Sequence, residues 1–151
     1  MARIYISSTF SDLMSYREAA YRALRMLRHD VVAMEDYVAA DQRPLDKCLA
    51  DVAASDLYIA IIAWKYGYVP SEGNPNLLSI TELEYRRAKE VGIPCLIFLL
   101  ADNAPWPPKE MDQVTGASDH GSRVSAFRQT LTRDYLVDFF QTPDELARPP
   151  R

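Results

Sequence analysis

The stretch SITELEYRRAKEVGIPCLIFLL, residues 79–100, combines the signals of a helix with those of a buried strand. Ser79 and Glu82 form a Ser-x-x-Glu capping box, and Gly92 follows the pattern, which predicts a helix over about residues 79–91. The continuous apolar run after the glycine is typical of a parallel strand that is buried on both faces. The stretch therefore predicts one helix–strand unit of an α/β fold.

Apolar runs and helical patterns alternate along the rest of the chain. The runs predict strands at residues 3–6, 31–34, 57–62, 94–100 and 135–140. The patterns between them predict helices at residues 11–28, 45–53, 79–91 and 124–132, with a short helix from about residue 142. Because parallel strands need helical crossovers, we predict a flavodoxin-like α/β fold. It is a three-layer sandwich around a parallel sheet of about five strands in the order 2-1-3-4-5.

The length and composition predict one folded domain. The 151 residues are 48% hydrophobic, which is enough for one full core, and no change in composition marks a second domain. We place the domain at residues 1–147. Residues 148–151, which include two prolines, are expected to begin a linker or tail.

The charge and the apolar runs argue against several classes of partner. The net charge of −4 and a pI near 5.2 argue against a basic face for nucleic acid. No apolar run approaches the roughly 20 residues that a membrane-spanning helix needs. No secretion leader precedes the first strand, and both cysteines lie in apolar patterns typical of reduced thiols, so we expect a cytoplasmic protein. The two cysteines and two histidines have no ligand spacing, which predicts no metal site.

Glu84 places a carboxylate on the apolar face of the helix at residues 79–91. Helical spacing puts it in a stripe whose other members are hydrophobic, namely Ile80, Leu83, Ala88 and Val91. Because a buried, unpaired charge is costly, this position predicts a catalytic or ligand-binding role. Two structural alternatives stay open: the side chain extends to the helix edge, or it pairs with a buried arginine. Glu82 is expected to cap the helix and to pair with Arg86.

A ligand is expected at the carboxyl ends of the first and third strands, where the strand order reverses. In this topology the loops at residues 7–10, 35–43 and 64–68 meet there. The first loop offers hydroxyls and amides at a helix start, which suit a phosphate or a ribose hydroxyl, through Ser7, Ser8, Thr9 and Phe10. An ordinary helix cap formed by Thr9 and Asp12 explains the same pattern equally well.

The other two loops supply further candidate contacts. Glu35 follows the second strand, where a carboxylate binds ribose hydroxyls in nucleotide-binding folds. Trp64 and Tyr66 follow the third strand and are candidates for stacking on a base or nicotinamide ring. Aromatic residues also end core strands without any ligand. Neither histidine has a nucleophile nearby in this topology, so no Ser-His-Asp or Cys-His site is expected.

Two other features favour structural roles. The first predicted helix carries four arginines typical of a solvated face, Arg17, Arg22, Arg25 and Arg28. Residues 101–123 are rich in Pro, Asp and Gly and predict a long surface excursion. Trp106 is expected to pin this excursion to the core, with a lid over a ligand as the alternative.

Four segments of the chain resemble a known family: IYISSTFSDL at residues 4–13, SDLY at 55–58, KYG at 65–67 and SITELEY at 79–85. The family is the TIR-like domain, formerly of unknown function, that begins many bacterial multidomain ATPases and repeat proteins. The resemblance covers residues 2–102. It implies a fold related to Toll/interleukin-1 receptor (TIR) domains and to nucleoside deoxyribosyltransferases.

The resemblance implies cleavage of an N-glycosidic bond. Deoxyribosyltransferases carry their glutamate in a Gly-Thr-x-x-Glu pattern with a later alanine, and Thr81, Glu84 and Ala88 match these spacings. Ser79 and Ile80 depart from the Asp and Gly elements that precede the glutamate there. Enzymatic TIR domains likewise place their catalytic glutamate on this helix. The implied reaction is hydrolysis of the nicotinamide–ribose bond of NAD.

The resemblance also implies roles and partners. Glu84 is the implied catalytic residue, with Ser8 and Phe10 on the phosphate and ribose side, Trp64 or Tyr66 stacking, and Thr81 orienting the substrate. NAD is expected as a substrate, with no cofactor. TIR-like relatives imply self-association, C-terminal sensor or ATPase domains, and a role as the effector of a bacterial immune or cell-suicide protein. Two alternatives stay open: a non-enzymatic assembly or adaptor module, and a nucleoside or nucleotide N-glycosidase.

Overall fold

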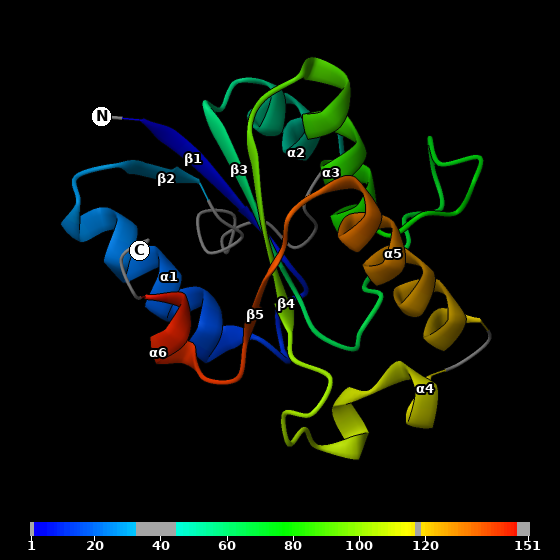
Figure 1. Cartoon of the computed structure of the whole chain (residues 1–151). Helices are drawn as coiled ribbons and strands as arrows, with labels where there is room; N and C mark the ends of the chain where they lie inside the picture. The colour runs from blue at the N-terminus through cyan, green and yellow to red at the C-terminus, as the bar shows by residue number, and fades with distance from the viewer. Residues whose placement is uncertain (1, 33–44, 117–118, 148–151) are drawn as a thin grey trace.

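A five-stranded, all-parallel sheet forms the centre of the molecule (Figure 1). The computed structural model describes residues 2–32, 45–116 and 119–147. The sheet order is β2-β1-β3-β4-β5, which confirms the predicted flavodoxin-like order. The strands are β1 (Arg3–Ser7), β2 (Asp30–Val32), β3 (Leu57–Ile62), β4 (Cys95–Leu100) and β5 (Asp138–Phe140).

Helices cover both faces of the sheet and complete the three layers (Figure 1). One face carries α2 (Leu45–Ala53), α3 (Ile80–Val91) and α5 (His120–Asp134). The opposite face carries α1 (Met14–Met26) and α6 (Pro143–Leu146), which pack against each other. A 3₁₀ turn, η2 (Pro108–Glu110), and a short helix, α4 (Asp112–Thr115), lie in the excursion between β4 and α5.

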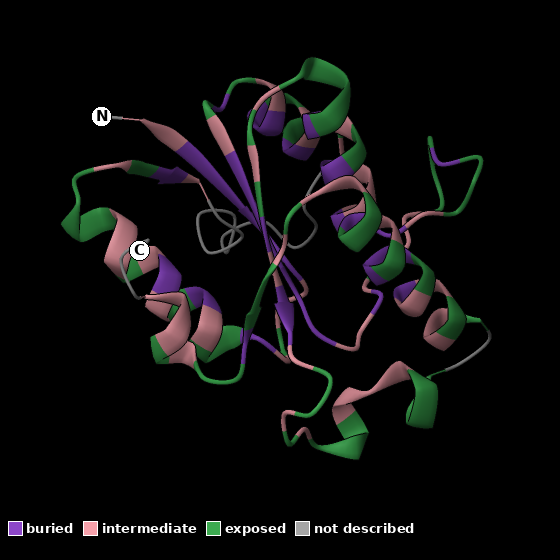
Figure 2. Cartoon of the chain, viewed as in Figure 1, coloured by how far each residue is buried: buried purple, intermediate pink, exposed green. Residues whose placement is uncertain are grey.

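Buried residues lie on the strands and on the helices of both faces (Figure 2). The alternation of side chains along the strands divides them into two core clusters, one on each side of the sheet. On β1, Tyr5 belongs to the cluster under α3, whereas Ile4 and Ile6 belong to the cluster under α1. Both faces of the inner strands are therefore buried, which is why their sequences are continuous apolar runs. Tyr5 and Tyr58 of the neighbouring strand β3 stack at a centroid distance of 6.4 Å.

Helix α3 begins and ends where its sequence predicts. The Ser79 hydroxyl accepts a hydrogen bond from the Glu82 amide at 3.1 Å, and Gly92 is left-handed with a φ of 81°. The predicted pair between Glu82 and Arg86 also forms, at 2.9 Å.

The buried face of α3 differs from the predicted apolar stripe. Its buried residues are Thr81, Glu84, Tyr85 and Ala88, whereas Val91 is 37% exposed. Tyr85, which lies outside the predicted stripe, is buried and its ring packs against that of Phe127 at a centroid distance of 5.6 Å. Glu84 belongs to both the predicted and the observed buried face, because it lies four residues after Ile80 and three residues after Thr81.

Two predictions for α1 are wrong. The helix expected at residues 11–28 is shorter, since it begins at Met14 and ends at Met26, and Leu27 after it is 65% exposed. Arg17, expected in a solvated basic face, is 1% exposed and lies under the loop that follows β1. Arg17 therefore supports this loop from below and is not part of the solvated helix surface.

Several predicted boundaries change. The strand expected at residues 31–34 is β2 (Asp30–Val32), and residues 33–44 lie outside the described chain. The last strand begins at Asp138, not at residue 135, because Tyr135 ends α5 and packs edge-on against Tyr85 at 5.9 Å. Cys48 and Cys95 form no disulfide bond. None of the helices in the described part of the chain has the length and apolar character needed to cross a bilayer.

Trp106 pins the excursion after β4 to the core. Its ring lies 5.6 Å from that of Tyr16 on α1 and packs against the cluster on that side of the sheet. This confirms the expected structural role of Trp106. The alternative role as a lid has no support, since the ring does not line the cavity described below.

Candidate active site

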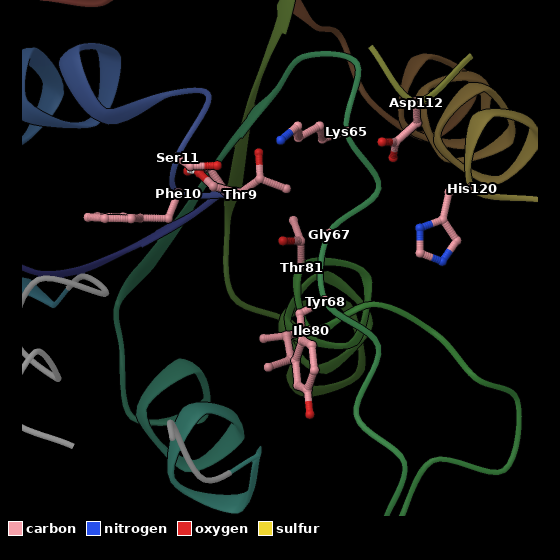
Figure 3. A pocket seen from close by; sticks show the side chains of 11 residues that line it. Thr9, Phe10, Ser11, Lys65, Gly67, Tyr68, Ile80, Thr81, Asp112 and His120 are labelled. Carbon is pink, nitrogen blue, oxygen red and sulfur yellow. Dashed lines mark hydrogen bonds between the residues drawn. The ribbon is translucent and has the colours of Figure 1, made fainter. Parts of the chain in front are cut away.

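A cavity of about 440 Å³ lies at the carboxyl ends of β1 and β3, where the strand order reverses (Figure 3). The loop after β1 supplies Ser8, Thr9, Phe10 and Ser11 to its lining. The loop after β3 supplies Lys65, Gly67 and Tyr68, and the first turn of α3 supplies Ile80 and Thr81. Asp112 of α4 and His120 of α5 complete the lining. Two of the three loops expected at this edge therefore meet around one cavity.

Arg17 holds the loop after β1. Its Nη1 donates a hydrogen bond to the Ser8 hydroxyl at 2.6 Å, and that hydroxyl donates to the Thr9 carbonyl at 2.6 Å. The guanidinium also lies over the Phe10 ring, 5.9 Å from its centroid. The Thr9 hydroxyl donates to Asp12 at 2.6 Å, although neither residue is the N-cap of α1, which is Leu13. Buried charge and local hydrogen bonds thus fix the hydroxyls of this loop.

Trp64 and Tyr66 do not line the cavity. The Trp64 ring lies under the Arg128 guanidinium, 4.0 Å from the ring centroid. The Tyr66 hydroxyl donates to Glu82 at 2.7 Å, and its ring meets His120 edge-on at 5.7 Å. Lys65, Gly67 and Tyr68 line the cavity from this loop, and the first two of them alternate with the two aromatic residues considered from sequence.

Arg128 of α5 holds the carboxyl ends of β3 and β4 together. Its Nη1 donates to the Ile62 and Ala63 carbonyls at 3.2 Å each, and its Nη2 donates to the Leu100 carbonyl at 2.6 Å. Burial lowers the pKa of this guanidinium, and the charge of Asp102 opposes that effect. Arg128 thus occupies the edge of the sheet between β3 and β4, which leaves the edge between β1 and β3 for the cavity.

Arg128 carries a sequence signal of the same kind as Glu84. The buried residues of α5 are spaced at i, i+3, i+4 and i+7, namely Val124, Phe127, Arg128 and Leu131. A charged residue stands in an apolar stripe, as Glu84 does on α3. The predicted helix at residues 124–132 contains this stripe, so the same test of periodicity identifies both buried charges.

Glu84 is 1% exposed and lies between α3 and the sheet. Its carboxylate accepts hydrogen bonds from the Tyr5 hydroxyl and, at 2.8 Å, from the Ser7 hydroxyl, both on β1. The side chain therefore does not extend to the helix edge. The nearby Tyr58 hydroxyl is buried without a hydrogen-bond partner among the described residues. Burial and then the negative charge of Glu84 raise the pKa of Tyr58 well above its usual value.

Glu84 lies next to the cavity wall and is not part of the lining. Thr81, which lines the cavity, precedes Glu84 by one turn on the same buried face of α3. Ser8, which also lines it, follows the Ser7 that hydrogen-bonds to the carboxylate. The structure thus groups Ser8, Thr9, Phe10 and Thr81 around the cavity and Ser7 with Glu84 behind its wall. Glu35 lies outside the described residues.

Asp112 and His120 come from segments that gave no sequence signal for this site. The Asp112 amide donates to the Trp64 carbonyl at 2.9 Å, and its carboxylate accepts from the Tyr66 amide at 2.7 Å. These two bonds fasten α4 to the loop after β3. In the described ranges, no three His, Cys, Asp or Glu side chains gather in a way that would hold a metal ion.

Gly67 lies in the cavity wall close to Thr9 and Thr81, and its replacement by alanine tests how closely these residues pack. A Cβ there would lie 3.1 Å from Thr9 Cγ2 and 3.7 Å from Thr81 Oγ1, at a φ of +101°. Gly92 has a similar φ of +81° with open space around it. Gly67→Ala is therefore expected to destabilise the fold by roughly 1–3 kcal/mol more than Gly92→Ala, since overpacking adds to the shared backbone strain. Urea unfolding of both variants measures this difference, and equal losses would contradict a tight wall at Gly67.

Comparison with known families assigns the chain to a family whose activity is not described. No curated protein matches it. The model of one family, described as a domain of unknown function (DUF4062), matches residues 3–149. That match covers nearly the whole chain, including both loops of the cavity and all of α3. The chain therefore belongs to the DUF4062 family.

Proposed function

We propose that this chain is a TIR-like NAD glycohydrolase, which cleaves the bond between nicotinamide and ribose. One observation carries the proposal: the buried carboxylate of Glu84 lies at the switch point of a parallel sheet, against the wall of a cavity of about 440 Å³. Ligand cavities in proteins typically measure about 300–1,000 Å³. A buried carboxylate with specific partners beside such a cavity is a typical feature of a catalytic site.

The chemistry of N-glycosidic cleavage suits this carboxylate. As the bond to nicotinamide breaks, its electron pair leaves with the neutral base, and positive charge develops on the ribose. A fixed negative charge in a site shielded from water stabilises that state. Water then adds to the anomeric carbon and releases a proton to the solvent. The hydroxyls of Tyr5 and Ser7 hold the Glu84 carboxylate in one orientation for this role.

The cavity lining suggests how a dinucleotide would lie. Thr81, one turn from Glu84, is proposed to orient the ribose, with Ser8, Thr9 and Phe10 on the ribose and phosphate side. Tyr68 lines the cavity with a largely exposed ring, so it replaces Trp64 and Tyr66 as the proposed stacking residue.

Glu84 is 1% exposed, so substrate contact requires a rearrangement of the wall. We propose that self-association supplies this change, as expected of a TIR-like module. The proposed setting is a cytoplasmic bacterial immune or cell-suicide protein, in which sensor or ATPase domains follow this domain.

The same burial favours a second candidate, a non-enzymatic assembly module. Tyr5 and Ser7 both donate to the Glu84 carboxylate, so it also fits a structural role as a buried polar group of the core. In that case Glu84 specifies the packing of α3 on the sheet and meets no substrate.

A turnover assay separates these candidates. Concentrated protein, alone and in an assembled form, is incubated with NAD and with a panel of nucleosides, and released bases are identified by chromatography. We expect nicotinamide to appear from NAD and no base to appear from the nucleosides. Intact NAD in both forms supports the assembly module, and base release from nucleosides supports a nucleoside glycosidase.

A further inference from the structure

Lys65 carries a positive charge into the cavity. It lies just beyond the end of β3, and its side chain extends toward the loop that holds Thr9 and Ser11 (Figure 3). The side chain is 29% exposed, so the ammonium group is partly withdrawn from solvent and still reachable from the cavity. A lysine that faces hydroxyl groups across a cavity is a common arrangement for binding phosphate.

Glu110 of η2 pairs with Lys65 and offsets its charge. Lys65 Nζ lies 3.2 Å from Glu110 Oε2, and the glutamate side chain is 24% exposed. The same oxygen has no aligned hydrogen bond within the described part of the chain, although it is buried. The contact therefore depends on charge attraction without the geometry of a good hydrogen bond. Such a partner is readily replaced by an anion that offers better geometry.

Glu110 lies on η2, between Trp106, which packs against the core, and Asp112, which is bonded to the loop after β3. η2 is three residues long, and the Glu110 amide is bonded to the Pro107 carbonyl at 2.9 Å within that turn. Asp12 is another acidic group near Lys65, and Asp112 lines the same cavity. Burial raises the pKa of Asp12, while its hydrogen bond from Thr9 and the charge of Lys65 lower it. Thr9 holds Asp12 and the Tyr66 amide holds Asp112, whereas the Glu110 oxygen next to Lys65 has no hydrogen bond within the described residues, so Glu110 is the carboxylate that a ligand would displace.

We infer that Lys65 forms an anion subsite for the diphosphate of a nucleotide, and that Glu110 is its resident competitor. The inference rests on the proposed function and specifies which part of NAD this side of the cavity recognises. A diphosphate brings more negative charge to Lys65 than one carboxylate does, and it can accept hydrogen bonds from the Ser11 and Thr81 hydroxyls, which also line the cavity. Bound diphosphate therefore releases Glu110 from Lys65.

Titration with inorganic pyrophosphate tests the subsite without requiring turnover. The readout is the NMR shift of the Gly67 amide at constant ionic strength, in the wild type and in variants with verified folding. Lys65→Met is expected to weaken binding about tenfold or more, because one charge-assisted contact is lost. Lys65→Arg keeps the charge and is expected to bind as the wild type does. Glu110→Gln is expected to bind several-fold more tightly, because the competing charge is removed.

Two variants control for net charge. Lys109→Met removes an exposed lysine next to Glu110, and Glu90→Gln removes an exposed glutamate at the far end of α3. Neither residue lines the cavity. The inference is overturned if Lys65→Met binds as tightly as Lys109→Met, if Glu110→Gln binds no more tightly than Glu90→Gln, or if neither the wild type nor Glu110→Gln binds pyrophosphate.

These outcomes are separable from those of the turnover assay. If pyrophosphate binding depends on Lys65 and NAD stays intact, the anion subsite is supported and the glycohydrolase proposal is rejected. If Lys65→Met hydrolyses NAD with an unchanged KM, the anion subsite is rejected and the glycohydrolase proposal is supported.

Discussion

Glu84→Gln is expected to lower the rate of NAD hydrolysis by at least about 10²–10³-fold, the loss typical of removing one group that stabilises transition-state charge. Glutamine keeps the volume of the side chain and an oxygen that can accept from Tyr5 or Ser7. It removes the negative charge that the developing positive charge on the ribose requires. The measurement is the initial rate of nicotinamide release at saturating NAD.

Glu90→Gln is the matched control for this experiment. It makes the same chemical change on the same helix at a glutamate whose side chain is 71% exposed, and it is expected to leave the rate unchanged. Urea unfolding of both variants checks that they are folded under the assay conditions. A Glu84→Gln protein that is folded and hydrolyses NAD at the rate of Glu90→Gln would assign Glu84 to the core alone.

Arg128→Met is expected to cause the largest loss of stability, about 3–5 kcal/mol. The guanidinium donates to three carbonyl oxygens at the ends of β3 and β4, those of Ile62, Ala63 and Leu100. Each buried acceptor left without its donor costs about 1–3 kcal/mol, and the contact with the Trp64 ring is lost as well. Methionine fills much of the volume, so the measured loss reports mainly the missing hydrogen bonds. Urea unfolding at 25 °C gives the change in free energy.

Two variants separate the buried hydrogen bonds of Arg128 from its charge. Asp102→Asn removes the carboxylate that pairs with Arg128, but that side chain is 83% exposed, so a loss below about 1 kcal/mol is expected. Arg133→Met removes an exposed arginine from the same helix and is expected to change stability by no more than about 0.5 kcal/mol. An Arg128→Met loss no larger than that of Asp102→Asn would show that the carbonyl contacts contribute little.

The sequence by itself determined the fold and the position of the buried glutamate. Residues 57–62 and 95–100 are apolar throughout because β3 and β4 lie inside a parallel sheet with helices on both faces, whereas a strand with one solvated face would alternate apolar and polar residues. The ends of α3 were predictable because Ser79 and Gly92 act on backbone groups within one turn. Glu84 stood out because helical spacing is a local property that requires no knowledge of the neighbouring strand.

The tertiary structure alone decided which side chains face the cavity. Trp64 and Lys65 are adjacent in sequence but have different partners. The Arg128 guanidinium stacks on the Trp64 ring, and Glu110 pairs with the Lys65 ammonium group. These partners lie far away along the chain, on α5 and η2. Asp112 and His120 reach the cavity in the same way. Local sequence patterns show which residues are buried and where a helix begins and ends. The pairing of distant polar groups depends instead on how whole helices and loops pack against the sheet.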